Sequence, residues 1–112
     1  MTQATGASLA PLYSTLLNDP DMTSLVEAYV AEMPDRIHNL ETALELGDVV
    51  GLQRLAHKLR GSAGGYGFAS LASAAGALEL AFCHGDEAQQ LERVNRVLTL
   101  CRRVAAAVST PV

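Results

Sequence analysis

The strongest constraint on the fold of this chain is the spacing of its apolar side chains, which recur every three or four residues through most of the sequence. That spacing lines one face of an α-helix, whereas a half-buried strand requires alternation of apolar and polar residues. Composition supports helix as well, because Ala and Leu are strong helix formers and supply nearly a third of the residues. The residues that strands favour are sparse, with one Ile, two Phe and three Tyr. We therefore expect an all-α protein.

Two apolar stripes occupy the first half of the chain. One over residues 9–16 predicts a short lead-in helix, and one over residues 22–44 predicts a long helix of about six turns. Asp19 followed by Pro20 is typical of an N-cap acid with proline at the first helical position, so we expect the long helix to begin there. Pro34 interrupts the stripe without changing its phase, which leaves a kinked helix and two abutting helices as open alternatives.

Three more amphipathic stripes follow, beginning at Val49, Phe68 and Leu91. Each stripe predicts one helix with a buried apolar side. The expected boundary signals are a left-handed cap at Gly47, an N-cap at Asp48, a stop near Gly85, and a capping box formed by Asp86 and Gln89.

The connections between these segments are short, so neighbouring helices must run antiparallel. The simplest packing is an antiparallel up-down four-helix bundle, with the lead-in helix as a short extra N-terminal helix. A chain of 112 residues fits a single domain, which we place at residues 8–109. We expect residues 1–7 and 110–112 to be frayed termini.

Charge and hydropathy exclude several classes of function. Twelve acidic against eight basic residues give a net charge of -4, which repels the phosphates of nucleic acids. No window approaches the roughly 18 uninterrupted apolar residues of a membrane helix, and the N-terminus lacks a secretory pattern. Cys83 and Cys101 lack the spacing of a disulfide scaffold or a zinc site, so we expect both to be reduced. The expected location is the cytoplasm.

The stretch that begins at His57 departs from ordinary helix composition. On a helical wheel, His57 lies about 130° from the centre of the apolar stripe, on the solvent side. Gly61, Gly64 and Gly65 fall on that same side of the predicted helix. Each glycine in a helix interior costs about 0.8 to 1 kcal/mol relative to alanine, so packing alone does not explain them. The missing side chains leave the imidazole open to a bulky partner, which we expect to be a protein.

Positive charge surrounds this histidine in an otherwise acidic chain. Arg54, Lys58 and Arg60 lie within about one turn of the imidazole. A neutral imidazole nitrogen is a nucleophile, and a phosphoryl group in transfer needs its negative charge balanced while the acceptor is held in line. Histidine, cations and open approach together indicate a phosphoryl acceptor. Two plainer interpretations stay open here: an ordinary surface histidine, and a helix that ends at Arg60 with Gly61 as its cap.

A sequence signature covers this same stretch. The run His57-Lys58-Leu59-Arg60-Gly61-Ser62-Ala63, with Gly67 ten residues after the histidine, matches the pattern H-x-L-[KR]-G-[SA]-[SA] at every position. Histidine-containing phosphotransfer (HPt) domains carry this pattern, and the chain resembles that family over roughly residues 19–108. The resemblance implies a four-helix bundle in which His57 accepts a phosphoryl group from a receiver-domain aspartate and passes it to another response regulator.

Roles for other residues follow from the same resemblance. Lys58 and Arg60 would help to hold the phosphoryl oxygens, and Gly61 would admit the partner. Some members orient the imidazole through a polar residue 22 positions after the histidine, which is Glu79 here. On the helical wheel Glu79 lies at the edge of an apolar face, where it can reach the Nδ1–H group and leave Nε2 free to attack. An ordinary boundary carboxylate is the alternative.

The sequence indicates no cofactor. The glycines of residues 61–67 lack a G-K-[ST] ending and follow a helix, so we expect no ATP site. No acidic cluster would hold Mg²⁺, which we expect on the receiver partner. His38 and His84 are expected to be surface or helix-end residues, and only Glu41 has a metal-ligand spacing from a histidine, His38. We therefore expect a phosphoryl carrier that must be supplied by another protein.

The expected partners are receiver domains of response regulators, a hybrid sensor histidine kinase, or both, and we expect a monomer. The alternative function is a docking or inhibitor module that binds a kinase or receiver domain without carrying phosphate. His57 distinguishes the two, because docking alone does not require a histidine. Met1 favours a stand-alone protein over a module of a larger kinase.

Overall fold

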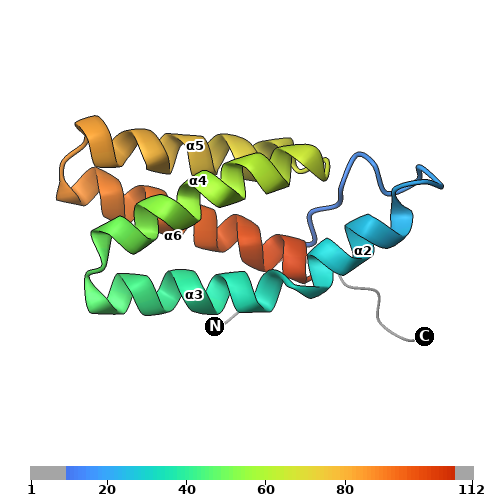
Figure 1. Cartoon of the computed structure of the whole chain (residues 1–112), viewed down its shortest axis with the longest axis horizontal. Helices are drawn as coiled ribbons and strands as arrows, with labels where there is room; N and C mark the ends of the chain where they lie inside the picture. Colours follow the sequence, from blue (N-terminus) through green and yellow to red (C-terminus); the bar gives the residue numbers. More distant parts are fainter. Residues whose placement is uncertain (1–9, 108–112) are drawn as a thin grey trace.

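A computed structural model describes residues 10–107, and these residues contain helices but no strand (Figure 1). Helices α3 to α6 surround one core, and each packs against the helix before and after it in a closed ring. Successive helices run in opposite directions, which confirms the antiparallel up-down bundle (Figure 1). The helices are α2 (Thr23–Ala31), α3 (Met33–Leu46), α4 (Val49–Gly65), α5 (Ala69–His84) and α6 (Glu87–Ala105).

The predicted lead-in helix is wrong for the residues that the structure describes. Residues 10–18 form a chain of turns, because their polar groups bond to distant elements. Leu12 N donates to Arg103 O over 2.9 Å, and the Ser14 hydroxyl donates to Tyr66 O over 2.6 Å. Leu9, the predicted frayed ends at residues 1–7 and 110–112, and the domain limits at residues 8 and 109 lie outside the described part.

The second stripe forms two abutting helices rather than one kinked helix. Helix α2 ends at Ala31, and α3 begins at Met33 with Pro34 in its first turn, where a missing N–H costs no hydrogen bond. The start predicted at Asp19 is also wrong by one turn. The Asp19 carboxylate accepts a hydrogen bond from Asp21 N over 2.9 Å, but this bond closes a turn ahead of α2.

The boundaries of the later helices agree with the sequence. Gly47 adopts a left-handed conformation with φ of 66° and ends α3, and the Asp48 carboxylate accepts from Gly51 N at the start of α4. Both hydrogen bonds of the capping box between Asp86 and Gln89 are present. Helix α4 continues to Gly65, so the alternative of a helix that ends at Arg60 is wrong.

Gly67 ties the turn between α4 and α5 to the segment before α2. Its φ of 84° lies in the left-handed region that favours glycine. A Cβ at this position would also stand 2.5 Å from Ser14 Oγ, while Gly67 O accepts a hydrogen bond from Thr15 N. Both the backbone conformation and the close approach therefore require glycine, which explains why the signature includes this position.

The core follows the predicted stripes except near helix starts. Leu52, Leu59, Leu71 and Leu78 are buried with most other stripe residues. Three stripe residues, however, are about half exposed, because they stand in the first two turns of their helices where neighbouring helices cover them less. These are Leu25, Val49 and Leu91.

Both cysteines are free thiols, and they differ in accessibility. Cys83 is exposed on α5, whereas Cys101 is fully buried in α6. Burial raises the pKa of the Cys101 thiol to about 12, so it is neutral and unreactive at physiological pH. Within residues 10–107, no helix combines the length and apolar character needed to cross a bilayer.

Leu78→Ala should destabilise the bundle by about 2–5 kcal/mol, because Leu78 is fully buried and its truncation leaves a cavity. Leu80→Ala is the matched control on the same helix, since Leu80 is 62% exposed and should change the free energy of unfolding by less than about 0.5 kcal/mol. Urea denaturation of both variants measures the difference. Equal effects would contradict the described burial.

Candidate functional site

His57 stands on a face of α4 that carries little else. Its side chain is 64% exposed, while its neighbours Ala56 and Leu59 on the other side of the helix are buried in the core. A Cβ added at Gly61 or Gly65 would meet no atom within 4 Å. Packing within the chain therefore does not require these glycines, and their effect is to keep the face next to the imidazole low and open.

The imidazole is held from the neighbouring helix by Glu79. His57 Nδ1 lies 2.7 Å from Glu79 Oε2, which joins the middle of α4 to α5. An ionised carboxylate can only accept hydrogen bonds, so Nδ1 carries the proton. In the neutral imidazole the other nitrogen, Nε2, then has its lone pair free. The contact thus fixes both the orientation and the tautomer that a nucleophilic Nε2 needs.

Arg60 shares the same carboxylate. Its Nε lies 3.4 Å from Glu79 Oε1, an ion pair without hydrogen-bond geometry, and Oε1 is buried with no other polar partner. The Arg60 side chain is half exposed, so its guanidinium borders both the carboxylate and solvent. One carboxylate therefore contacts the predicted phosphoryl acceptor through one oxygen and the predicted phosphate ligand through the other.

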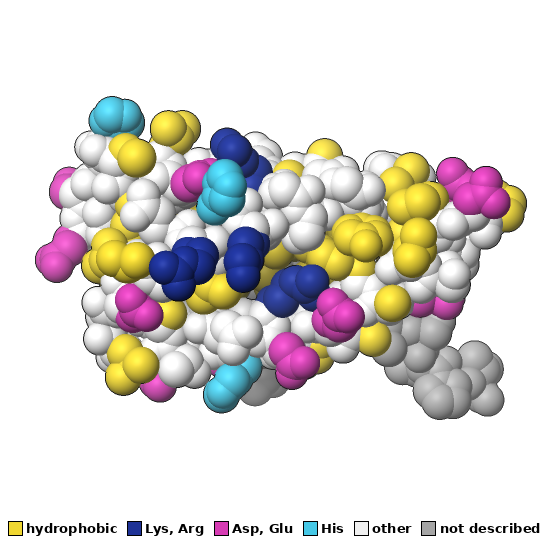
Figure 2. Space-filling model, in the orientation of Figure 1, with side chains coloured by type: hydrophobic (Ala, Val, Ile, Leu, Met, Phe, Trp, Pro, Cys, Tyr) yellow, Lys and Arg dark blue, Asp and Glu magenta, His cyan; other side chains and the backbone are white. Residues whose placement is uncertain are grey.

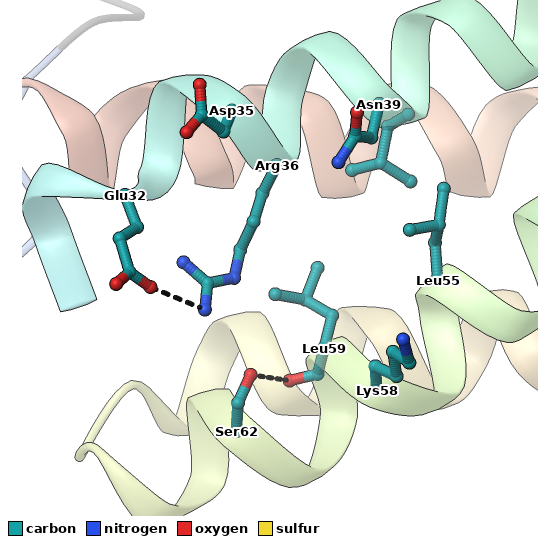
Figure 3. A pocket seen from close by; sticks show the side chains of 9 residues that line it. Glu32, Asp35, Arg36, Asn39, Leu55, Lys58, Leu59 and Ser62 are labelled. Atoms are coloured by element: carbon teal, nitrogen blue, oxygen red, sulfur yellow. Dashed lines mark hydrogen bonds and ion pairs between the residues drawn. The ribbon is translucent and has the colours of Figure 1, made fainter.

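Lys58 lies on the opposite side of His57 from this cluster. It lines a pocket between α3 and α4 together with Arg36, which extends from α3 across the opening (Figure 3). Among residues 10–107, no hydrogen bond or ion pair joins Lys58 to His57 or Glu79. Arg54 is likewise exposed on α4. Basic side chains consequently gather across the middle of the face that α4 presents (Figure 2).

Ser62 supports the site from behind. Its hydroxyl lies 2.8 Å from the Tyr29 hydroxyl, and the Tyr29 ring stacks on Tyr66 at the end of α4 with ring centroids 4.5 Å apart. Arg36 covers the other side of Tyr29, with its guanidinium carbon 4.3 Å from the ring centroid. These contacts fix the glycine-rich half of α4, where helix propensity is low, against α2 and α3.

Neither of the other histidines forms a comparable site. His38 and His84 are exposed, and Glu41, at metal-ligand spacing from His38, instead binds Arg102 over 2.7 Å. No group of three or more His, Cys, Asp or Glu side chains within residues 10–107 is placed to hold a metal ion.

The structure brings together three of the five residues singled out in the sequence, His57, Arg60 and Glu79, and leaves Gly61 open beside them. Lys58 is separate. Gly76 on α5 escaped the sequence analysis, although a glycine in the interior of a helix was a signal that could have been followed. Its nearest neighbour in space is the aliphatic stem of Arg60.

Comparison with known proteins gives one match. Residues 24–107 match the family model described as the Hpt domain. No curated protein and no solved structure matches the sequence significantly. The matched range extends from α2 to the segment just after α6, and it contains every residue of the His57 cluster.

Glu79→Ala should abolish the tautomer preference of the His57 imidazole, because the variant lacks the acceptor for Nδ1–H. Long-range ¹H–¹⁵N spectra above about pH 8, where an ordinary imidazole is neutral, distinguish the two tautomers. The unchanged protein should give the Nδ1–H pattern at His57, with exposed His38 as an internal reference. An Nε2–H pattern in the unchanged protein would rule out the described contact.

Proposed function

Because the chain belongs to the Hpt domain family, which carries out histidine phosphotransfer in two-component phosphorelays, we propose that His57 is the residue that carries the phosphoryl group. It accepts this group from the aspartyl phosphate of one receiver domain and passes it to the aspartate of another response regulator. The observation that carries the proposal is the 2.7 Å contact between Nδ1 and Glu79, which leaves Nε2 as the free nucleophile on an open helix face.

The chemistry is an exchange of one bond to phosphorus for another. The Nε2 lone pair of His57 forms the N–P bond while the P–O bond of the acyl phosphate breaks, and the aspartate leaves as a carboxylate. The imidazole ring becomes positively charged, and its Nδ1 proton stays on the hydrogen bond to Glu79. Transfer to the next receiver reverses these steps.

The basic side chains supply charge balance. A phosphoryl group in transfer spreads negative charge over three oxygens, and preorganised cations stabilise it. Arg60 is the nearest cation to the cluster through its contact with Glu79, and we assign it the phosphoryl oxygens first. Lys58, which lies towards α3, is the second candidate and would act when a docked partner brings the phosphoryl group over α4.

The partner has to supply what this chain lacks. Hpt domains interact with receiver domains and kinases, and we infer that Mg²⁺ is bound by the receiver and that ATP is used only by an upstream kinase. We also infer that the protein acts as a cytoplasmic monomer. Support for the monomer is that one chain contributes His57, Glu79, Arg60 and the glycine face together.

His57→Gln should abolish phosphorylation by a phosphorylated receiver domain, since the variant has no imidazole nucleophile. The unchanged protein should acquire an acid-labile, base-stable phosphate, detected with labelled phosphate after acid and base treatment. His38→Gln and His84→Gln are matched controls, because both residues are exposed and lie outside the cluster. Label retained in His57→Gln would refute the assignment.

The docking-module alternative predicts a different result from His57→Ala. A carrier with this substitution keeps its affinity for the receiver but loses transfer, whereas an adaptor keeps its whole function. Isothermal titration calorimetry with the receiver domain, combined with the phosphorylation assay, separates the two outcomes.

Gly61→Gln should block receiver docking without destabilising the fold. A side chain at this position meets no atom of the chain within 4 Å, and glutamine gains a few tenths to about 1 kcal/mol of helix stability over glycine. We therefore expect an equal or higher melting temperature together with at least a tenfold loss of receiver affinity, measured by calorimetry. Unchanged affinity would show that the partner approaches elsewhere.

A further inference from the structure

A glycine in the interior of α5 lies directly beside the Arg60 side chain. Gly76 is in the middle of a 16-residue helix, where glycine costs about 1 kcal/mol relative to alanine. A Cβ built at Gly76 would lie 3.2 Å from Arg60 Cδ and 3.9 Å from Arg60 Cγ, and no other group outside its own helix backbone and immediate neighbours would lie within 4 Å. The absence of a side chain therefore makes room for Arg60 alone.

The path of Arg60 explains what that room provides. The side chain leaves α4, crosses α5 at Gly76, and brings its Nε to 3.4 Å from Glu79 Oε1, one turn further along α5. A half-exposed arginine has many rotamers in water, and holding it in one place costs conformational entropy. The flat surface at Gly76 favours the one path that ends beside the carboxylate which also holds His57.

We propose that Gly76 is a positioning residue for phosphotransfer, which by its missing side chain keeps the Arg60 guanidinium on Glu79, next to the reactive histidine. This inference rests on the proposed function of His57. Before transfer, Arg60 pairs with the buried Oε1 of Glu79. When the phosphoryl group arrives on Nε2, it brings nearly two negative charges, and the guanidinium turns from the carboxylate to the phosphoryl oxygens.

Two other reasons for a glycine at this position are separable from this one. Close packing between helices does not explain it, because no atom of a neighbouring helix other than those of Arg60 lies within 4 Å of the added Cβ. The residue also lines an open hollow with Ser73, Ala77 and Leu80, which a docking partner could fill. In that case substitutions in the hollow would change receiver affinity whether or not Arg60 were present.

The test is a double-mutant cycle between Gly76→Leu and Arg60→Ala. The rate of phosphoryl transfer from a phosphorylated receiver is measured for the unchanged protein, both single variants and the double variant. We expect Gly76→Leu to lower the maximal rate about tenfold at unchanged receiver affinity, a loss of about 1.4 kcal/mol in transition-state stabilisation. In the Arg60→Ala background the same substitution should have no further effect.

Three companion measurements keep the result interpretable. Gly76→Ala should be at least as stable as the unchanged protein, because alanine is the better helix former, and should reduce the rate less than Gly76→Leu. Ser73→Leu, which adds an apolar side chain to the same hollow one turn earlier, should leave the rate unchanged. The ¹⁵N signal of Arg60 Nε should shift in Gly76→Leu, which reports the displaced guanidinium independently of activity.

Additive effects of the two substitutions, or an unchanged Arg60 Nε signal, would overturn the role of Gly76. A loss of receiver affinity in both Gly76→Leu and Ser73→Leu would overturn it in favour of a docking hollow. Absence of phosphorylation in the unchanged protein would contradict the proposed function itself. Normal phosphorylation with additive substitutions would contradict only the inference about Gly76.

Discussion

The hydrogen bond between His57 Nδ1 and Glu79 Oε2 joins α4 to α5, and the other features of the site take their meaning from it. It assigns the proton to Nδ1 and the free lone pair to Nε2. It also places a carboxylate where Arg60 can be held close to the imidazole. Without this bond, an exposed histidine on α4 would rotate freely, and the open face beside it would present no defined nucleophile to a partner.

The bundle accepts a cost in stability to keep that face open. Helix α4 has glycine at positions 61, 64 and 65, and each costs about 1 kcal/mol relative to alanine. The structure compensates behind the helix. The Tyr29 hydroxyl contacts Ser62, the Tyr29 and Tyr66 rings stack, and Ala63 is fully buried in the core. Stability therefore comes from one side of α4, and access to the histidine from the other.

Much of this fold follows from local sequence patterns. Caps at Gly47 and Asp48 and the capping box at Asp86 act over a few residues, so the bounds of α4 and α6 could be predicted. The stretch before α2 could not, because its hydrogen bonds go to residues such as Tyr66, which are 52 positions away. Pro34 left two alternatives that only the packing of α2 and α3 decides.

The site shows the same division between local and distant information. The exposure of His57 and the open glycine face follow from helix phase, whereas the place of Glu79 depended on a family resemblance and on the contact between two helices. A helical wheel does not fix the phase of α5 relative to α4. For this reason the sequence did not separate Lys58, which lies towards α3, from Arg60, which lies across α5, and it gave no reason to select Gly76.

The central claim is that Nε2 of His57 carries the phosphoryl group while Nδ1 remains bonded to Glu79. The most direct measurement is ¹⁵N and ³¹P NMR of the histidine-labelled protein after phosphorylation by a receiver domain. We predict a scalar coupling between ³¹P and Nε2 of His57, with the proton still on Nδ1. A phosphorus coupling to Nδ1, or to the ring of His38 or His84, would contradict the account.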